Sequence, residues 1–288
     1  MIKVVTDSSS ELPPEMAKKL GIEVVPLYVR FGEEIHRERV TISDEEFYQK
    51  LVAGPIYPAT IQPGPNDFIE TYEAVAKGTD GIVSIHISSK LSGTVNSALQ
   101  AKSMANLDCP IEVVDSQTVS VALGLITIAA AEAARQGKDL QQVLNVAKDA
   151  MDNTYSLCIL DTLKYLQIGG RIGKAKALLG TMLNVKPLIT VKDGEVVPVG
   201  QVRSRAKGLG QLFEFIQKAE RIDDLAIGYS TTLDDALSLS QQVASIFNKD
   251  QIKVMRLGTT LGVHLGPGAL ILSYRGKASG TNTISQEI

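Results

Sequence analysis

The stretch IKVVTDSSSELPPEMAKKLGIEVVPLYV, residues 2–29, carries the pattern that decides the fold. An apolar run at 2–5 predicts a strand, and residues 14–20 predict a helix that ends at Gly21. A second apolar run at 22–29 predicts another strand. A helix-length segment between two short apolar runs is typical of an α/β protein, in which helices cover a largely parallel sheet.

The same alternation continues through the first half of the chain. Apolar runs at 81–87 and 111–114 predict two further strands, and Pro63-Gly64-Pro65 marks a loop. The helices expected in this half cover residues 67–77, a segment that starts near 92, 119–135 and 140–151. The first half therefore reads as a parallel-sheet α/β unit.

The second half has a signal that the first half lacks. Asp193-Gly194 between two apolar runs is typical of an antiparallel hairpin, expected at 188–202. The other elements expected here are helices at 174–183, 206–219 and 233–247 and strands at 155–160, 225–229, 252–257 and 269–274. We predict an N-terminal α/β domain at 1–155, with an excursion near 30–55, and a C-terminal mixed α/β domain at 156–288.

Composition argues against several classes of partner. The chain has 288 residues, 44% of them hydrophobic, and a formal net charge of −3 without long runs of one sign. A protein that binds nucleic acid or an anionic membrane surface usually shows a basic patch or tract. We therefore expect neither nucleic acid nor stable membrane insertion.

The cysteines and the apolar segments indicate a cytoplasmic protein. Cys109 and Cys158 share no C-x-x-C spacing, which favours reduced thiols. Asp7 follows the first apolar run too early for a signal peptide. The most apolar stretch, 119–134, is shorter than the roughly 20 residues of a bilayer span, and we expect it to be a buried helix.

The strongest candidate site for an anion is Ser92-Gly93-Thr94, which follows the strand at 81–87. Backbone N–H groups and the dipole of the next helix favour an anion at such a junction. Ser92 and Thr94 would add hydroxyl donors, and Gly93 permits close approach. The alternative is that Ser92 is only a helix N-cap.

Two other loops offer groups for the same kind of ligand. Thr60 precedes the rigid segment 62–65, and His264 lies in a glycine-rich stretch at 263–269 that we expect to be a turn after a strand. Beside a bound carboxylate, His264 would donate a hydrogen bond and its positive form would be favoured. Both loops, and the segment TDSSS at 6–10, also fit ordinary turns or caps.

Basic residues accompany a second glycine-rich segment, GGRIGK at 169–174. Ile168 and Ala175 break the phosphate-loop pattern, so no nucleotide site is expected. Arg171, Arg203 and Arg205 fit either a solvated surface or contact with a phosphate or a partner's acidic patch. The motifs H-E-x-x-H, G-x-G-x-x-G and G-x-S-x-G are absent, so we expect no metal and no cofactor.

Eight short motifs, taken in order along essentially the whole chain, resemble the DegV family. They are Thr6-Asp7-Ser8, Thr60-x-Gln62-Pro63-x-Pro65, Ser88-Ser89-x-Leu91-Ser92-Gly93-Thr94, Asp115-Ser116, Gly170-Arg171-Ile172, Lys186-Pro187, Arg203-x-Arg205-x-Lys207 and His264-x-Gly266-Pro267-Gly268. Each string is unspecific alone, whereas the ordered set is specific. Ile61 and Gly64 depart from the family's common T-S-Q-P-S-P loop, which puts details of the polar network in doubt.

The resemblance implies a two-domain protein that holds one long-chain fatty acid, such as palmitate, between its domains. It implies that a separate fatty acid kinase phosphorylates the carboxylate, as a step of phospholipid metabolism. Thr60 and Ser92 match the carboxylate contacts of the family, His264 matches the histidine of that cluster, and Gly93 and Thr94 complete the ligand-binding set. The basic positions Arg171, Arg203 and Arg205 match the side that faces the kinase or a phosphate.

Burial of an acyl tail is energetically consistent with this function. Each buried CH₂ contributes about 0.8 kcal/mol, so fourteen methylenes contribute on the order of 11 kcal/mol before ordering costs. A buried carboxylate needs paired donors, because leaving it unpaired costs several kcal/mol. The hydroxyls and the histidine would supply these donors.

Two other functions remain open at this point. A serine hydrolase or acyltransferase would use Ser92 as nucleophile and His264 as base, with Asp7 or Asp115 as the orienting acid. A protein similar to a sugar kinase or dihydroxyacetone kinase is suggested by α/β similarity alone. We favour a lipid-binding protein that is not itself an enzyme.

Overall fold

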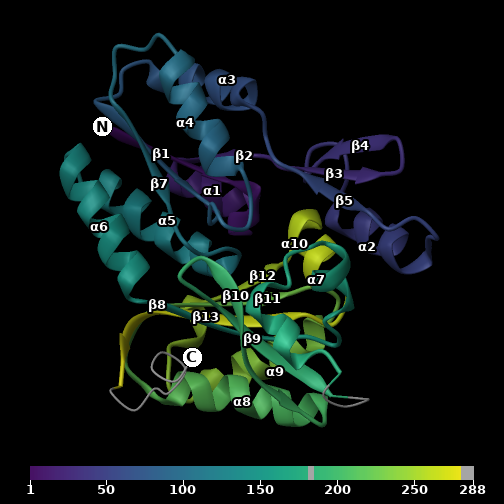
Figure 1. Ribbon diagram of the computed structural model, residues 1–288. Helices are drawn as coiled ribbons and strands as arrows, with labels where there is room; N and C mark the ends of the chain where they lie inside the picture. Colours follow the sequence, from purple (N-terminus) through teal and green to yellow (C-terminus); the bar gives the residue numbers. More distant parts are fainter. Residues whose placement is uncertain (181–184, 280–288) are drawn as a thin grey trace.

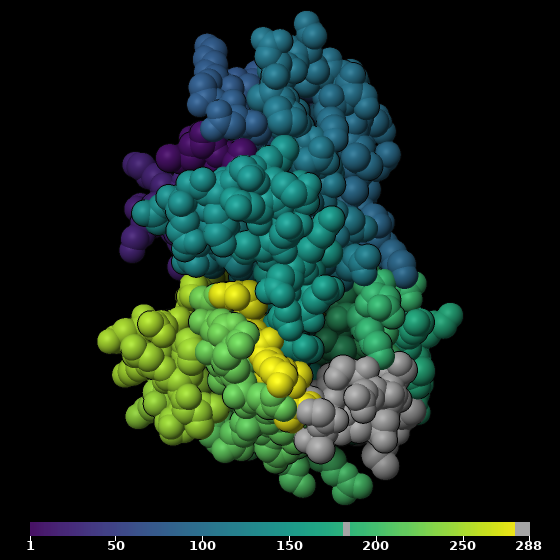
Figure 2. All heavy atoms as spheres, turned by 90° about the vertical axis from the view of Figure 1, so that its left-hand side faces the viewer, coloured from purple at the N-terminus to yellow at the C-terminus, as the bar shows by residue number. Residues whose placement is uncertain are grey.

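The computed structural model describes residues 1–180 and 185–279, and these residues form a mixed α/β protein built around two main sheets. Figure 1 shows the two sheets one above the other, with a smaller sheet to one side. In the space-filling view of Figure 2, the blue and teal residues of the first half form the upper mass and the green and yellow residues form the lower one. The predicted α/β fold class is confirmed.

The upper sheet is entirely parallel, with the order β2-β1-β6-β7. Its strands are β1 (Ile2–Asp7), β2 (Ile22–Val25), β6 (Gly81–His86) and β7 (Ile111–Asp115). Its helices are α1 (Pro14–Leu20), α3 (Pro65–Ala76), α4 (Thr94–Met104), α5 (Val121–Arg135) and α6 (Leu140–Asp152), which follow a short 3₁₀ turn η1 (Ser8–Ser10). On β1, Val4 packs into the core with α1, α5 and α6, whereas Val5 packs with α3 and α4, so both faces of the sheet are covered. We call this unit the N-terminal lobe.

The lower sheet is mixed, with the order β10-β9-β8-β13-β11-β12, and only β11 and β12 pair in parallel. Its strands are β8 (Thr154–Ile159), β9 (Lys186–Lys192), β10 (Glu195–Val202), β11 (Ala219–Tyr229), β12 (Ile252–Arg256) and β13 (Leu270–Ala278). The other elements are α7 (Lys164–Ile168), η2 (Gly173–Leu178), α8 (Arg205–Gln217), α9 (Leu233–Val243), η3 (Lys249–Gln251) and α10 (Thr259–Leu265). This unit is the C-terminal lobe. The predicted hairpin around Asp193-Gly194 is confirmed as β9 and β10.

The segment after β2 leaves the upper sheet and forms a small unit of its own. It contains β3 (Tyr28–Phe31), β4 (Glu34–Arg37), α2 (Asp44–Ala53) and β5 (Ala59–Ile61), with the sheet order β4-β3-β5. Figure 1 shows this excursion beside α10 and α7 of the C-terminal lobe. The excursion therefore brings β5 of the first half against the second half of the chain.

Helix α5 lies between the two main sheets. It contacts β1 above and β8, β11 and β13 below, and 13 of its 15 residues are buried. A helix that is apolar on all sides needs cover on all sides, and the two sheets provide it. The expectation of a buried helix in this stretch is confirmed, and none of the described helices is long and apolar enough to cross a bilayer.

Several predicted elements were wrong in detail. The strand expected at 22–29 is split into β2 and β3 around Pro26, which has no N–H to donate to a sheet. The helix expected at 174–183 is the 3₁₀ helix η2, and residues 181–184 lie outside the described part. The turn expected around His264 is the helix α10, and the short helix α7 was not predicted. The domain boundary near residue 155 remains a proposal, close to the start of β8.

The contact between α5 and η1 yields a prediction about stability. A Cβ atom at Gly124 would lie 2.6 Å from the Ser10 carbonyl oxygen, so Gly124→Ala should push α5 away from η1. We expect a loss of about 1–3 kcal/mol in the free energy of unfolding, as for other overpacked sites. The matched control is Gly210→Ala in α8, where a Cβ meets nothing within 4 Å and should stabilise the helix by about 0.5–1 kcal/mol. Equal effects of the two changes in urea unfolding would contradict this packing.

Candidate functional site

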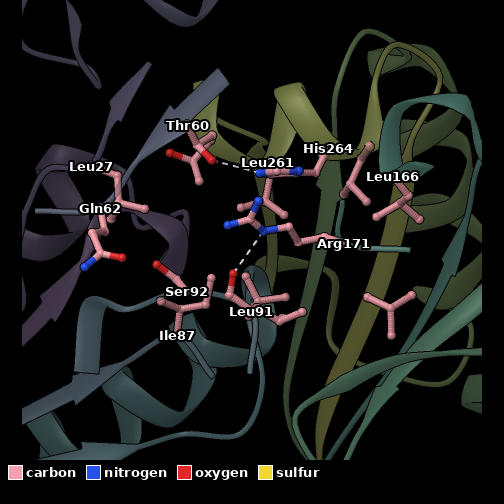
Figure 3. Close-up of a pocket in the computed structure, with 14 residues that line it drawn as sticks. Leu27, Thr60, Gln62, Ile87, Leu91, Ser92, Leu166, Arg171, Leu261 and His264 are labelled. Atoms are coloured by element: carbon pink, nitrogen blue, oxygen red, sulfur yellow. Dashed lines mark hydrogen bonds between the residues drawn. The ribbon is translucent and has the colours of Figure 1, made fainter. Parts of the chain in front are cut away.

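A cavity of about 110 Å³ lies where the N-terminal lobe, the excursion and the C-terminal lobe meet (Figure 3). Eight of its lining residues are leucine, isoleucine or valine. The polar ones are Thr60, Gln62, Ser92, Arg171, Thr260 and His264. The cavity therefore combines an apolar wall with a small group of polar side chains, which is the usual composition of a ligand site.

Thr60 and His264 are joined across the cavity, although 204 residues separate them in the chain. Thr60 lies on β5, where it pairs with Val29 of β3, and His264 lies in the last turn of α10. The Thr60 Oγ1 atom is 3.0 Å from His264 Nε2. The other ring nitrogen, Nδ1, is buried and has no hydrogen-bond partner among the described residues. A Cβ atom at Gly169 would collide with Nδ1, so glycine is required there for the ring to fit.

Ser92 enters the cavity from the loop between β6 and α4. Its Oγ atom is 2.8 Å from Thr94 Oγ1, and α4 has Gly93 as its N-cap residue. The interpretation of Ser92 as a helix N-cap is therefore wrong. Gln62 lies against Gly93 and donates from Nε2 to Ser97 Oγ at 3.3 Å.

Arg171 lies at the edge of the cavity, between the Thr60–His264 pair and Leu91 in Figure 3. Its Nε donates to the Leu91 carbonyl at 3.2 Å, and its Nη1 donates to the Gly169 carbonyl at 2.8 Å. It also lines an adjacent open groove together with Ser92 and Gly93. Of the residues that line the cavity, Arg171 alone carries a full positive charge at neutral pH.

His264 is neutral at physiological pH in this environment. Burial of the ring, together with repulsion from the Arg171 guanidinium, lowers the pKa of His264 to about 4. The sequence led us to expect the positive form next to a bound carboxylate. The protein groups alone favour the neutral form, because burial disfavours the charged ring.

The other two arginines lie outside the cavity. Arg203 is exposed just before α8. Arg205 bonds within the C-terminal lobe, donating from Nε to Asp235 at 2.8 Å and from Nη2 to Thr232 Oγ1 at 3.0 Å. Its Nη1 donates to the Gly268 carbonyl at 2.5 Å, so its guanidinium holds the turn after α10.

The described residues do not form a Ser-His-Asp arrangement at Ser92. Asp7 accepts from the backbone N–H of Ile87 and lies 3.0 Å from His86 Nδ1, in a fully buried position. Asp115 accepts from the hydroxyl of Ser89. Neither acid is bonded to His264, so the orienting carboxylate of a hydrolase is not in place. Among the described residues, no group of His, Cys, Asp and Glu side chains could hold a metal ion.

Helix α10 supplies lining residues that we did not single out from the sequence. Thr260, Leu261 and Leu265 reach the cavity together with His264. Positions 260, 261, 264 and 265 are one or four residues apart in pairs, a spacing that places them on one face of a helix. This spacing was the available signal, but the glycines that flank the segment favoured a turn.

Comparisons with known proteins agree along nearly the whole chain. Residues 1–277 match a family model described as "Uncharacterised protein, DegV family". A DegV domain-containing protein of Halalkalibacterium halodurans is 36% identical over 279 residues, covering 95% of this chain and 98% of the relative.

Two solved structures share the fold. One is a DegV family protein from Thermus thermophilus, described for its fatty acid binding. It is 36% identical to this chain, has a TM-score of 0.88, and the match covers 95% of this chain and 99% of that chain. The other is a stearic acid-binding protein from Eubacterium ventriosum. It is 27% identical to this chain, has a TM-score of 0.86, and the match covers 96% of this chain and 98% of that chain.

The ionisation of His264 can be tested directly. We expect an NMR titration to give its ring a pKa of about 4 and Arg171→Gln to raise this pKa, though not to the ordinary value of about 6.5, because burial is the larger cause. As the pH falls from about 6.5 to about 4, the unfolded chain takes up a proton that folded His264 does not, so His264 destabilises the fold over this window. His264→Asn assigns the signal, and Arg221→Gln on the surface is the control. An unchanged pKa in Arg171→Gln would contradict the described geometry.

Proposed function

The chain belongs to the DegV family, and from this premise we propose that it binds one long-chain fatty acid in the cavity between its lobes. The carboxylate contacts Thr60 and Ser92, with His264 behind Thr60 and with Gly93 and Thr94 beside Ser92. The observation that carries the proposal is the convergence of Thr60, Ser92 and His264 from three separate segments on one largely apolar cavity.

Hydrogen-bond directions explain how a neutral histidine serves a negative ligand. If Nε2 of His264 carries the ring proton, it donates to Thr60 Oγ1, and the Thr60 hydroxyl is then free to donate to the carboxylate. Ser92 provides a second hydroxyl, whose Oγ atom is also hydrogen-bonded to Thr94 Oγ1. Arg171 supplies the compensating charge at the cavity edge. Hydrogen bonds to an ionised acceptor are roughly twice as strong as neutral ones, so this small set suffices for the head group.

The apolar wall accounts for the tail. Leu261 and Leu265 of α10 line the cavity together with Leu27, Ile87 and other aliphatic side chains. A cavity of about 150 Å³ holds benzene, so the 110 Å³ found here encloses only part of a long acyl chain. We expect the remainder of the tail to displace aliphatic side chains or to part the lobes. The ligands named for the two similar structures support an acyl ligand of this class.

We further propose that the protein acts in the cytoplasm as a carrier in phospholipid metabolism and presents its ligand to a separate fatty acid kinase. The head group lies beside the open groove of Ser92, Gly93 and Arg171, from which a second protein could reach the carboxylate. Exposed Arg203 is then a contact for that partner, and Arg205 supports the same face through its bonds to Asp235 and Thr232. The bonding pattern of Asp7 and Asp115 gives no support to the hydrolase alternative.

Ligand retention tests the proposed binding. We expect protein purified from a bacterial host to release fatty acid on extraction, detected by mass spectrometry, because burial of the tail slows its release. Thr60→Val and Ser92→Ala should each weaken fatty-acid affinity by roughly tenfold or more, the usual effect of losing a hydrogen bond to a charged group. Ser89→Ala, whose hydroxyl bonds Asp115 instead, is the matched control. Well-folded protein that neither retains nor binds any fatty acid would rule the proposal out.

Arg203 offers a separate test of partner contact. Arg203→Ala should leave fatty-acid affinity unchanged, because the side chain lies outside the cavity lining, and should lower the rate at which a fatty acid kinase phosphorylates the bound ligand. Arg221→Ala, another exposed arginine, which pairs with Asp223 in the C-terminal lobe, is the control. Loss of fatty-acid affinity in Arg203→Ala, or unchanged phosphorylation, would refute this role.

A further inference from the structure

A cluster of two buried acids and one partly buried acid lies outside the cavity, where the excursion meets both lobes. Glu11 follows η1, and Glu38 and Asp44 belong to the excursion. Glu11 and Glu38 are 0% and 1% exposed. Arg39 lies among the acids, with its Nη2 2.9 Å from Glu11 and its Nε 3.1 Å from Asp44. Burial of acidic side chains is costly, so each one requires strong partners.

The partners of Glu38 are donors from the other two parts of the molecule. Its Oε1 accepts from the backbone N–H of Thr260 at 2.9 Å, and its Oε2 accepts from the Thr260 hydroxyl at 2.8 Å. The same Oε2 accepts from the hydroxyl of Ser8 in η1, at 2.5 Å. Glu38 thus ties the excursion to α10 and to the N-terminal lobe at once.

Helix α10 depends on these acids for its first turn. Its N-cap residue, Gly258, has no side chain with which to cap the helix. Glu38 satisfies the N–H of Thr260, and Glu11 satisfies the N–H of Gly258 at 2.6 Å. Carboxylates at this end of a helix are also favoured by the helix dipole. The acids therefore perform the capping that the helix cannot provide for itself.

The acid cluster and the Thr60–His264 pair lie at the two ends of one short helix. Helix α10 has seven residues, about 10 Å of axis, with Thr260 at the acid cluster and His264 at the head-group site. Thr260 also lines the cavity, and so does Leu27, whose backbone N–H donates to Ser8 Oγ at 2.9 Å. A displacement of Glu38 would therefore be transmitted to two parts of the cavity lining, to Thr260 directly and to Leu27 through Ser8.

We propose that Glu38 is a positioning residue for the head-group site. By bonding Thr260 it locks α10 against the excursion and so keeps His264 within hydrogen-bond distance of Thr60. The proposal deepens the fatty-acid function and rests on it for the role of the lock in ligand exchange. Because the cavity encloses only part of an acyl chain, a whole ligand needs room from displaced aliphatic side chains or from separation of the walls, and α10 carries the lining residues Leu261 and Leu265. Release of α10 from Glu38 is the step that permits this separation.

The test compares Glu38→Gln with the wild type and with Glu34→Gln as control. Glutamine keeps the size of Glu38 but removes its negative charge and one of its two acceptor oxygens, whereas Glu34 lies on the same excursion, exposed, with Lys50 as its partner. Ser8→Ala is a milder second variant, which removes one of the donors to Glu38. Two quantities are measured on delipidated protein: hydrogen exchange of the α10 amides without ligand, and the dissociation rate of a fluorescent fatty acid.

We expect Glu38→Gln to raise both α10 exchange and the dissociation rate by about tenfold or more, Ser8→Ala to raise them less, and the control to raise neither. If the folded Glu38→Gln and Ser8→Ala variants both showed unchanged hydrogen exchange of the α10 amides, the proposal that Glu38 holds α10 would be wrong. Faster exchange with an unchanged dissociation rate would overturn its link to the ligand site. If the wild type bound no fatty acid, the proposed function would fail, and the exchange measurement, which needs no ligand, would still decide whether Glu38 holds α10.

Discussion

The burial of α5 between the two main sheets is the constraint on which the rest of the structure depends. Its apolar residues pack on β1 of the upper sheet and on β8, β11 and β13 of the lower sheet, so neither sheet can bury its inner face without this helix. The hydrophobic effect has no preferred direction. This packing therefore fixes the distance between the sheets, but it does not determine which side chains occupy the edge of the space between them, which we call the rim. The rim is where α10, β5 and the loop before α4 meet, and the cavity lies there.

Polar contacts determine the geometry of this rim. Thr60 and His264 join the excursion to α10, and Glu38 joins the excursion, α10 and the N-terminal lobe. The buried acids are costly in themselves, yet they satisfy amide groups at the start of α10 that would otherwise be unpaired. Apolar packing thus provides the bulk of the stability, and a few directional bonds decide which side chains face the cavity.

Much of the fold could be predicted because strands and long helices have strong periodic signals. The parallel first half, the hairpin at Asp193-Gly194 and the buried helix α5 all follow from patterns within one segment. The short helices α7 and α10 have few residues and flanking glycines, and their conformation depends on tertiary partners such as Glu38. The bonds from the acid cluster to α10 were not predicted, since they join residues more than two hundred positions apart and none of the motifs links these residues. Ser92 and Thr60 stood out as loop hydroxyls, but only the structure shows that Arg171 lies at the same cavity.

The electrostatics of the site explain why a neutral histidine suits the proposed ligand. Without a negative ligand, a positive His264 would lie in a buried position near the Arg171 guanidinium, and both factors lower its pKa. A carboxylate bound at Thr60 would bring one negative charge, which Arg171 already balances, so the ring has no need to become charged. His264 can then act through the Thr60 hydroxyl as a fixed donor rather than as an ion. Such a site prefers an anion that has one negative charge and a long apolar tail, because a second negative charge would have no fixed cation among the cavity's lining residues.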